Sequence, residues 1–174
     1  MAIKEILTEP NKKLREISKP VDKVSKEEQI LMDDMLETMY KAPGIGLAAV
    51  QLGIPKRIVV IDISKDENKK DPIYFVNPEL TWKSKEKATY EEGCLSIPDQ
   101  FAKIDRPEKC TVKFLDYNGN LKEMKAEGLL ATCIQHEIDH LNGILFIDYL
   151  SKLKKDIIIK KLSKNKKELE RIVV

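Results

Sequence analysis

The 174-residue sequence is poor in the residues that usually build metal sites and disulfides, with only two histidines and three cysteines. An odd number of cysteines excludes a complete disulfide framework, and we expect a reducing compartment. Glycine and proline, at 7 and 8 residues, are too few for a fibrous or low-complexity chain. The longest β-rich apolar run covers residues 58–61 and is far too short to span a bilayer, so no membrane partner is expected.

Charge is also close to balanced, with 31 Lys and Arg against 29 Asp and Glu and a net charge of +2. This balance excludes an acidic tail protein and a general nucleic-acid-coating protein, so no DNA partner is expected. The N-terminus carries charges from Lys4 onward, and Glu5 and Glu9 argue against a transit peptide, which predicts a cytoplasmic protein. Without an internal repeat or a Ser/Gly linker, residues 1–174 are expected to form one domain.

Hydrophobic periodicity and turn residues predict an α+β fold, with antiparallel β-sheets around a central helix and a basic helix at the C-terminus. Ser25 and Glu28 form a capping box at the start of the first helix. Asn118-Gly119 predicts a hairpin with a type I′ turn. The expected helices cover residues 25–41, 129–141 and 151 to the end, and the expected strands cover 57–63, 73–76, 111–115 and about 120–126.

Both histidines lie in the segment Gln135-His-Glu-Ile-Asp-His140, which has the H-E-x-x-H spacing. On the helix predicted there, His136 and His140 lie on one face, one turn apart, where both imidazoles can bind one metal ion. Glu137 lies beside that face and can act on a metal-bound water. The chain therefore contains a candidate catalytic metal helix.

A catalytic metal site needs a third protein ligand and an open position. Glu168 and Glu170 lie in a lysine-rich stretch that is typical of a solvated face. Cys133 lies roughly 10 Å along the helix axis from the second histidine and is expected to pack in the core. Cys110 is interpreted as structural, whereas Cys94 lies in a predicted glycine-containing turn away from the helix and could close the site from the opposite side.

Three motifs together resemble the peptide deformylase family. Residues 44–51 match G-x-G-x-A-A-x-Q, residues 92–96 match E-G-C-L-S, and residues 135–140 match Q-H-E-x-D-H. They occur in the family's order and at family-like separations, and the resemblance runs from about Leu7 to the basic C-terminal helix. It implies a hydrolase of protein biosynthesis that removes the N-formyl group from the N-terminal formyl-methionine of newly made polypeptides.

The resemblance also implies one divalent metal, most commonly Fe²⁺ and replaceable by Ni²⁺, Co²⁺ or Zn²⁺. Position by position, Cys94, His136 and His140 would bind this metal, and Glu137 would be the general acid/base acting on metal-activated water. The side-chain amide of Gln51 and the backbone N–H of Leu95 would stabilise the oxyanion. The expected substrate-binding residues, which would hold the peptide like an added strand, are Ile45, Gly46, Tyr90, Glu91 and Gly93.

Two residues depart from common members of the family. Pro43 stands where a polar or acidic residue is frequent, and Phe101 stands in a region that often carries a basic or polar side chain near the substrate. Both positions bear on which residue is preferred after methionine. Two interpretations of Arg106 are open. It could pair with Glu92 or Asp139 and support the metal site, or it could be an ordinary surface arginine.

Three other functions agree less well with the sequence. Residues 44–49 match part of a dinucleotide fingerprint, but the fingerprint must follow a strand and a helix is predicted there. A general metalloprotease would share H-E-x-x-H but lacks a third histidine at Phe146. A closed zinc module would need Cys133 as a fourth ligand, and the presence of Glu137 and Gln51 counts against it.

The segment from Ser151 onward has nine Lys or Arg and three Asp or Glu, a net charge of +6 that leaves −4 on the rest of the chain. A basic helix on an acidic body suggests an electrostatic contact with ribosomal RNA, where nascent chains emerge. The alternative is a solvated amphipathic helix that packs on the domain through Leu153, Ile157 and Leu162. The sequence leaves both interpretations open.

Overall fold

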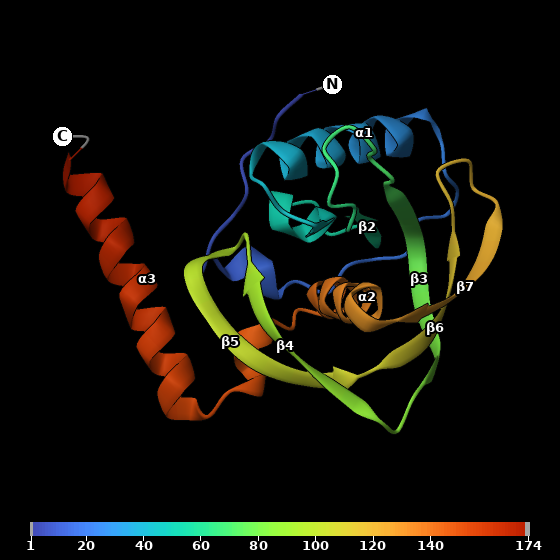
Figure 1. The fold of residues 1–174 in the computed structure, drawn as a ribbon. Helices are drawn as coiled ribbons and strands as arrows, with labels where there is room; N and C mark the ends of the chain where they lie inside the picture. Colours follow the sequence, from blue (N-terminus) through green and yellow to red (C-terminus); the bar gives the residue numbers. More distant parts are fainter. Residues whose placement is uncertain (1, 173–174) are drawn as a thin grey trace.

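The computed structural model describes residues 2–172, with side chains as far as residue 168 in the last helix. Two antiparallel sheets and three α-helices confirm the predicted α+β class (Figure 1). The helices are α1 (Lys26–Lys41), α2 (Gly128–Leu141) and α3 (Lys152–Ile172), with short 3₁₀ helices η1 (Lys12–Arg15), η2 (Ala49–Leu52) and η3 (Phe146–Tyr149). The strands are β1 (Gly46–Ala48), β2 (Ile58–Ile61), β3 (Ile73–Lys83), β4 (Lys87–Cys94), β5 (Ile97–Pro107), β6 (Lys109–Leu115) and β7 (Leu121–Glu127).

The larger sheet has the strand order β1-β2-β3-β6-β7 and is covered by a helix on each face. All four residues of β2 are buried, because successive side chains point to opposite faces and both faces are covered. Val59 and Ile61 belong to the core beneath α2, and Ile58 and Val60 belong to the core beneath α1. The continuous apolar run that marked this strand in the sequence follows from burial on both sides.

The smaller sheet consists of β4 and β5 and lies on the other side of α2 (Figure 1). Helix α2 contacts strands of both sheets, so its residues are buried almost all round. Ile97 and Ile104 of β5 pack with Phe146, Ile147 and Leu162 in a third core cluster. This cluster fixes the small sheet against the C-terminal part of the chain.

The small sheet is the main part of the fold that was not predicted from the sequence. Residues 91–96 were expected to form a turn, but β4 runs to Cys94 and the turn is confined to Leu95 and Ser96. Along β4 and most of β5 exposed residues alternate with partly or fully buried ones, because one face of this sheet is solvated. The metal-ligand candidate Cys94 is therefore placed by a strand end.

Strand β3 was expected to end at Asn77-Pro78, which is wrong, since it continues to Lys83. Asn77 has a φ of 51°, and the register with β6 shifts between Val76 and Glu79. The Asn77 side-chain amide exchanges two hydrogen bonds of 2.8 Å with the backbone of Val21. This long-range contact holds a bulge through which the strand passes the proline.

The β6–β7 hairpin is confirmed, but the predicted type I′ turn is wrong. That turn needs a positive φ at both central residues, whereas Gly119 has a φ of 81° and Asn118 is not in the left-handed region. The N–H of Gly119 donates to the carbonyl of Asp116 at 2.9 Å, and the Asp116 carboxylate accepts from the N–H groups of Asn118 and Asn120. The aspartate therefore selects a longer loop with a single left-handed glycine.

Helix α3 begins one residue after the predicted start, and residues 173–174 lie outside the described part of the chain. It extends beside the body of the molecule (Figure 1). Leu162 packs on the domain as expected, but Leu153 is 71% exposed and Ile157 is 45% exposed. Ile158 and Ile159 pack in their place, so the expected apolar face was wrong by about one residue. None of the described helices is long and apolar enough to cross a membrane.

Candidate active site

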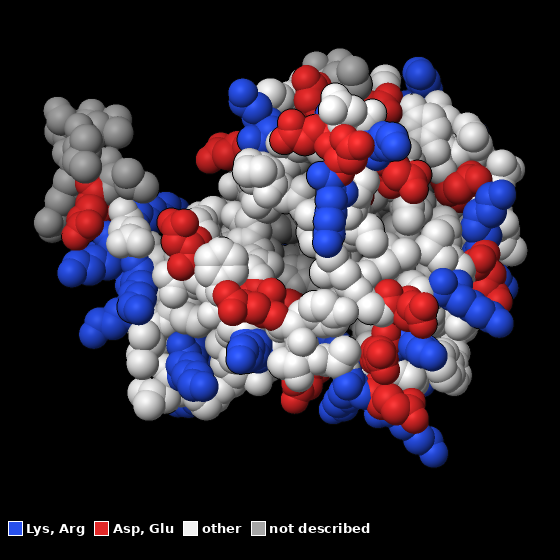
Figure 2. Space-filling model, viewed as in Figure 1, with Lys and Arg blue, Asp and Glu red and all other residues white. Residues whose placement is uncertain are grey.

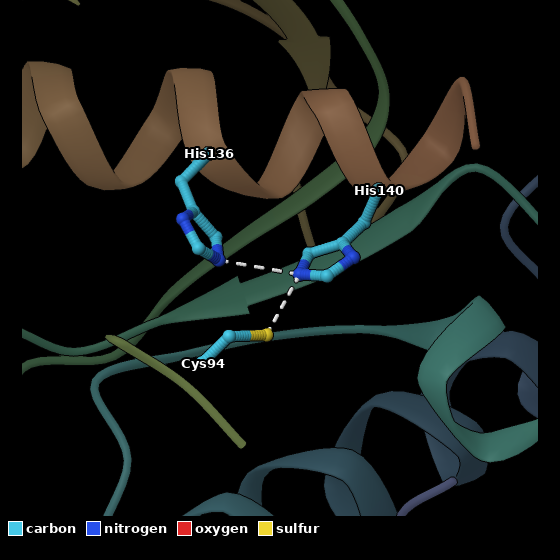
Figure 3. Close-up of side chains that lie close together, drawn as sticks. All are labelled: Cys94, His136 and His140. Carbon is cyan, nitrogen blue, oxygen red and sulfur yellow. Dashed lines mark hydrogen bonds between the residues drawn. The ribbon is translucent and has the colours of Figure 1, made fainter. Parts of the chain in front are cut away.

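Three potential metal ligands from two elements converge at the centre of the molecule (Figure 3). Cys94 comes from the end of β4, and His136 and His140 come from adjacent turns of α2. The Nε2 atom of His140 lies 3.3 Å from the Sγ atom of Cys94 and 3.2 Å from the Nε2 atom of His136. One thiolate and two imidazoles with mutually close donor atoms fit a divalent transition metal.

The other cysteines do not join this group in the part of the chain that the structure describes. Burial raises the pKa of Cys133 to about 12, so its side chain is a thiol at neutral pH. Cys110 lies in the core beneath α2, and burial raises its pKa to about 11. The four-ligand closed module considered from the sequence is therefore not formed.

The orientation of His136 is set by a buried carboxylate from the neighbouring strand. Its Nδ1 atom lies 2.8 Å from Oε1 of Glu92, which leaves Nε2 facing the other two ligand atoms. Arg106 donates to both carboxylate oxygens of Glu92, at 2.7 and 3.0 Å. Burial raises the pKa of Glu92, but the hydrogen bonds from His136 and Arg106 outweigh it and hold the pKa below its usual value.

Arg106 is a buried part of this site, and the surface-arginine reading is wrong. It contacts both candidate partners, because its third nitrogen, Nη1, donates to the Asp139 carboxylate at 2.8 Å. Tyr149 from η3 donates its hydroxyl to the same carboxylate at 2.7 Å, and the guanidinium carbon lies 4.9 Å from the centre of its ring. Tyr149 was not predicted as a site residue, because it lies outside the three sequence motifs.

Glu137 is buried beside the ligands, and its Oε2 atom has no hydrogen-bond partner among the described residues. Burial raises its pKa to about 7, near the value at which a carboxyl both accepts and gives up a proton at neutral pH. Gly46 makes room for it, since a Cβ atom at that position would lie 2.5 Å from Oε1 of Glu137. The first glycine-rich motif and the histidine motif therefore meet at this carboxyl group.

The amide of Gln51 is held from both ends. Its Oε1 atom accepts from the N–H of Ala48 at 2.9 Å, and its Nε2 atom donates to Oγ of Ser96 at 3.0 Å. The same nitrogen lies 3.6 Å from the Cys94 sulfur. Ser96 is fully buried and was not predicted as a site residue. The signal that could have indicated its role is the polar side chain at the end of the second motif.

A cavity of about 340 Å³ opens onto these groups, and Figure 2 shows a hollow on this face of the molecule. Every predicted site residue except His140 lines this cavity, and the His140 side chain is almost completely buried. The lining residues are Pro43, Gly44, Ile45, Gly46, Gln51, Tyr90, Glu91, Glu92, Gly93, Cys94, Leu95, Phe101, Leu129, Thr132, Cys133, His136 and Glu137.

Two strand edges meet this cavity. Within residues 2–172, β1 is the outer strand of the large sheet, and β4 pairs only with β5. Residues 44–46 and 90–94 both line the cavity. Unpaired strand edges present backbone N–H and C=O groups that an extended peptide can pair with. The cavity therefore combines a metal-ligand set, a buried carboxyl group and two open edges.

Comparisons with known proteins show to which family this chain, with its cavity and potential metal ligands, belongs. The sequence model of the family described as polypeptide deformylase matches residues 3–156. A peptide deformylase from Pelagibacter ubique (strain HTCC1062) is 67% identical over 174 residues, covering 100% of both chains. A crystal structure of peptide deformylase from Ehrlichia chaffeensis has a TM-score of 0.91 at 44% identity and covers 96% of this chain and 98% of that chain. A second, in complex with actinonin, has a TM-score of 0.89 at 47% identity, with 95% and 98% covered. The chain belongs to the peptide deformylase family of enzymes.

Proposed function

We propose that this enzyme removes the formyl group from the N-terminal formyl-methionine of newly made polypeptides, with Fe²⁺ as its metal. The observation that carries the proposal is the convergence of Cys94, His136 and His140 beside the carboxyl group of Glu137, whose Oε2 atom has no hydrogen-bond partner among the described residues. A substrate that emerges from the ribosome places the enzyme in the cytoplasm. Fe²⁺ is proposed because thiolate and imidazole ligands suit it and because the family resemblance favours it.

A divalent cation held by these ligands would supply Lewis acidity for attack of water on the formyl carbon. One thiolate and two neutral imidazoles leave the site with a net charge of +1, which acidifies water less than three histidines would, so a protein base matters more. Glu137 takes the proton from the attacking water as the new C–O bond forms. It then passes that proton to the amine as the C–N bond breaks, so that formate and a free N-terminus leave.

Oxyanion stabilisation is assigned to Gln51 and Leu95. The Gln51 amide is already oriented by Ala48 and Ser96, so little reorganisation is needed when negative charge develops. The backbone N–H of Leu95 directly follows the ligand Cys94 in the chain. Together they provide two neutral donors, which do not compete with the protein ligands for the metal.

The substrate backbone is proposed to add as a strand between β1 and β4. Ile45 and Gly46 would contact it from one side, and Tyr90, Glu91 and Gly93 from the other, since both segments line the cavity. Main-chain pairing gives affinity for any sequence, and side-chain pockets add selectivity. This mode suits an enzyme that acts on many different polypeptides.

A deformylation assay tests the proposed function. Protein prepared anaerobically with Fe²⁺ or Ni²⁺ should release formate from formyl-Met-Ala-Ser and leave acetyl-Met-Ala-Ser intact. Formate release is measured by a coupled dehydrogenase, and the free amine by chromatography. Hydrolysis of both peptides at similar rates, or of neither, would contradict the proposal.

Cysteine oxidation provides an independent test of the ligand assignment. Cys94 is partly exposed and borders the cavity, whereas Cys110 and Cys133 are buried thiols with raised pKa values. We expect the Fe²⁺ form to lose activity in air while the Ni²⁺ form keeps it, and added oxygen to appear first at Cys94. Peptide mass spectrometry follows the three cysteines in time. Oxidation confined to the buried pair, or equal lifetimes of the two metal forms, would refute the assignment.

Helix α3 is proposed to contact ribosomal RNA. Figure 2 shows basic side chains along its described part, where Lys160, Lys161 and Lys164 are exposed. The family match ends at residue 156, so most of α3 lies beyond the region that matches the family model. Contacts between lysines and phosphates release counterions, so such binding weakens steeply with salt.

Replacement of these three lysines by glutamate should abolish co-sedimentation with ribosomes at low salt, without changing turnover of a free formyl-peptide. The matched control replaces Lys65, Lys69 and Lys113, which are exposed elsewhere, with the same change in net charge. Equal ribosome binding by both triple variants would remove α3 from the proposal.

A further inference from the structure

Phe101 lies on the solvated face of the small sheet, next to the mouth of the cavity. Along β5, Phe101, Lys103 and Asp105 are exposed, whereas Ile104 and Arg106 are buried on the opposite face. Lys103 lies opposite Glu91 of β4, whose side chain is also exposed. The ring therefore belongs to the outer face of the sheet, and it is 64% exposed.

The ring reaches the cavity because Gly93, on the neighbouring strand, has no side chain. A Cβ atom on Gly93 would lie 2.6 Å from Cε1 of Phe101, so the ring rests against the glycine backbone. Both residues line the cavity. The aromatic surface is thereby brought to the open edge of β4, where the substrate backbone is proposed to pass.

The alternation of side chains along a strand determines which substrate residue meets this ring. In a peptide added between β1 and β4, the methionine side chain points inward, toward Leu129, Thr132 and Cys133 of α2, which line the cavity. The next side chain then points outward, to the face that carries Phe101. We propose that Phe101 is a specificity-determining residue that favours an apolar or aromatic side chain directly after methionine. This inference rests on the proposed function and extends it.

Charge on the same face supports an apolar preference. Glu91 and Lys103 are direct cross-strand neighbours of opposite sign, so this pair adds no net charge to the face. The exposed ring is a large apolar surface at this edge, and a substrate side chain that covers it removes apolar area from water. An aromatic pair adds enough to raise kcat/KM about 3- to 10-fold over alanine.

The test compares kcat/KM for formyl-Met-Phe-Ser and formyl-Met-Ala-Ser in the metal-loaded enzyme. The wild-type enzyme should prefer phenylalanine about 3- to 10-fold, and Phe101→Ala should bring the ratio close to 1 while still hydrolysing the alanine peptide. Phe101→Gln keeps an aliphatic stem over Gly93 should the alanine variant fold poorly, and because it has neither a ring nor a charge it should lose the aromatic preference as well. Formyl-Met-Ala-Phe places the ring one residue later, on the inner side, and its rate relative to formyl-Met-Ala-Ala should not depend on residue 101.

Leu121→Ala is the matched control, since Leu121 is 63% exposed on β7, outside the cavity lining, and its removal should leave the ratio unchanged. A ratio that persists in the Phe101 variants overturns the inference, as does an equal loss on all peptides, which would indicate a structural role. No preference in the wild-type enzyme also overturns it, while leaving the proposed function intact. Absence of turnover on every formylated peptide instead overturns the proposed function, and this inference with it.

Discussion

Glu137→Ala is expected to lower deformylation about 10²- to 10⁴-fold while the protein keeps its fold and its metal. The carboxyl group lies next to the ligands but is not one of them, and its Oε2 atom has no other partner in the described part of the chain. Its removal therefore takes away the proton acceptor and leaves the thiolate and both imidazoles in place. Metal content by atomic spectroscopy and turnover of formyl-Met-Ala-Ser are measured on the same preparation.

Glu123→Ala serves as the control, because Glu123 is an exposed carboxylate on β7 outside the cavity. It should match the wild-type enzyme in both measurements. Loss of metal together with activity in Glu137→Ala would make Glu137 a ligand and refute its role as a base. Retention of full activity would assign the proton transfer to another group.

Arg106→Ala should destabilise the protein by about 3–5 kcal/mol, because it leaves the buried carboxylate of Glu92 without its bidentate partner. Glu92 also orients His136, so we expect metal affinity to fall about 10- to 100-fold. Urea unfolding of the metal-free protein gives the stability, and competition with a chelator gives the affinity. Measuring both separates a loss of fold from a loss of ligand geometry.

Arg57→Ala is the comparison, since the Arg57 guanidinium donates to the Asn142 side chain and the Pro78 carbonyl, and its side chain is only half-buried. It should cost less stability and leave metal affinity close to wild type. If Arg106→Ala were no more destabilising than Arg57→Ala, the buried network would not support the metal site.

Local patterns were enough to predict α2 and its two histidines. The 3.6-residue period, the i, i+4 spacing and the Asn142-Gly143 end all lie within one segment, and the structure has the helix there with Gly143 at a φ of 75°. The three family motifs also contain most of the residues that line the cavity, although Leu129, Thr132 and Cys133 on α2 lie outside them. These features depend on short stretches of sequence, which is why they could be read without a structure.

The missed features depend on contacts between distant segments. β4 has few β-branched residues, and its pairing with β5 is visible only once Glu92 is found opposite Ala102 with Arg106 close by. Asn77-Pro78 has the local signature of a turn, and only the contact with Val21 turns it into a bulge. Tyr149 joins the site through Asp139, on another element. No pattern within a short window predicts such pairings.

Binding at the two open strand edges requires an extended N-terminus, so deformylation is expected to take place before the N-terminus of the substrate folds. In the binding mode proposed above, the peptide adds between β1 and β4 and is extended over its first residues, so we expect an N-terminus already folded into a helix or sheet not to be a substrate. Ribosomes add about 5–20 residues per second, and N-terminal domains begin to fold during synthesis. Deformylation therefore competes with folding of the nascent chain, and a formylated protein whose N-terminus becomes buried early should keep its formyl group. Comparing formate release from such a protein before and after refolding would measure this competition.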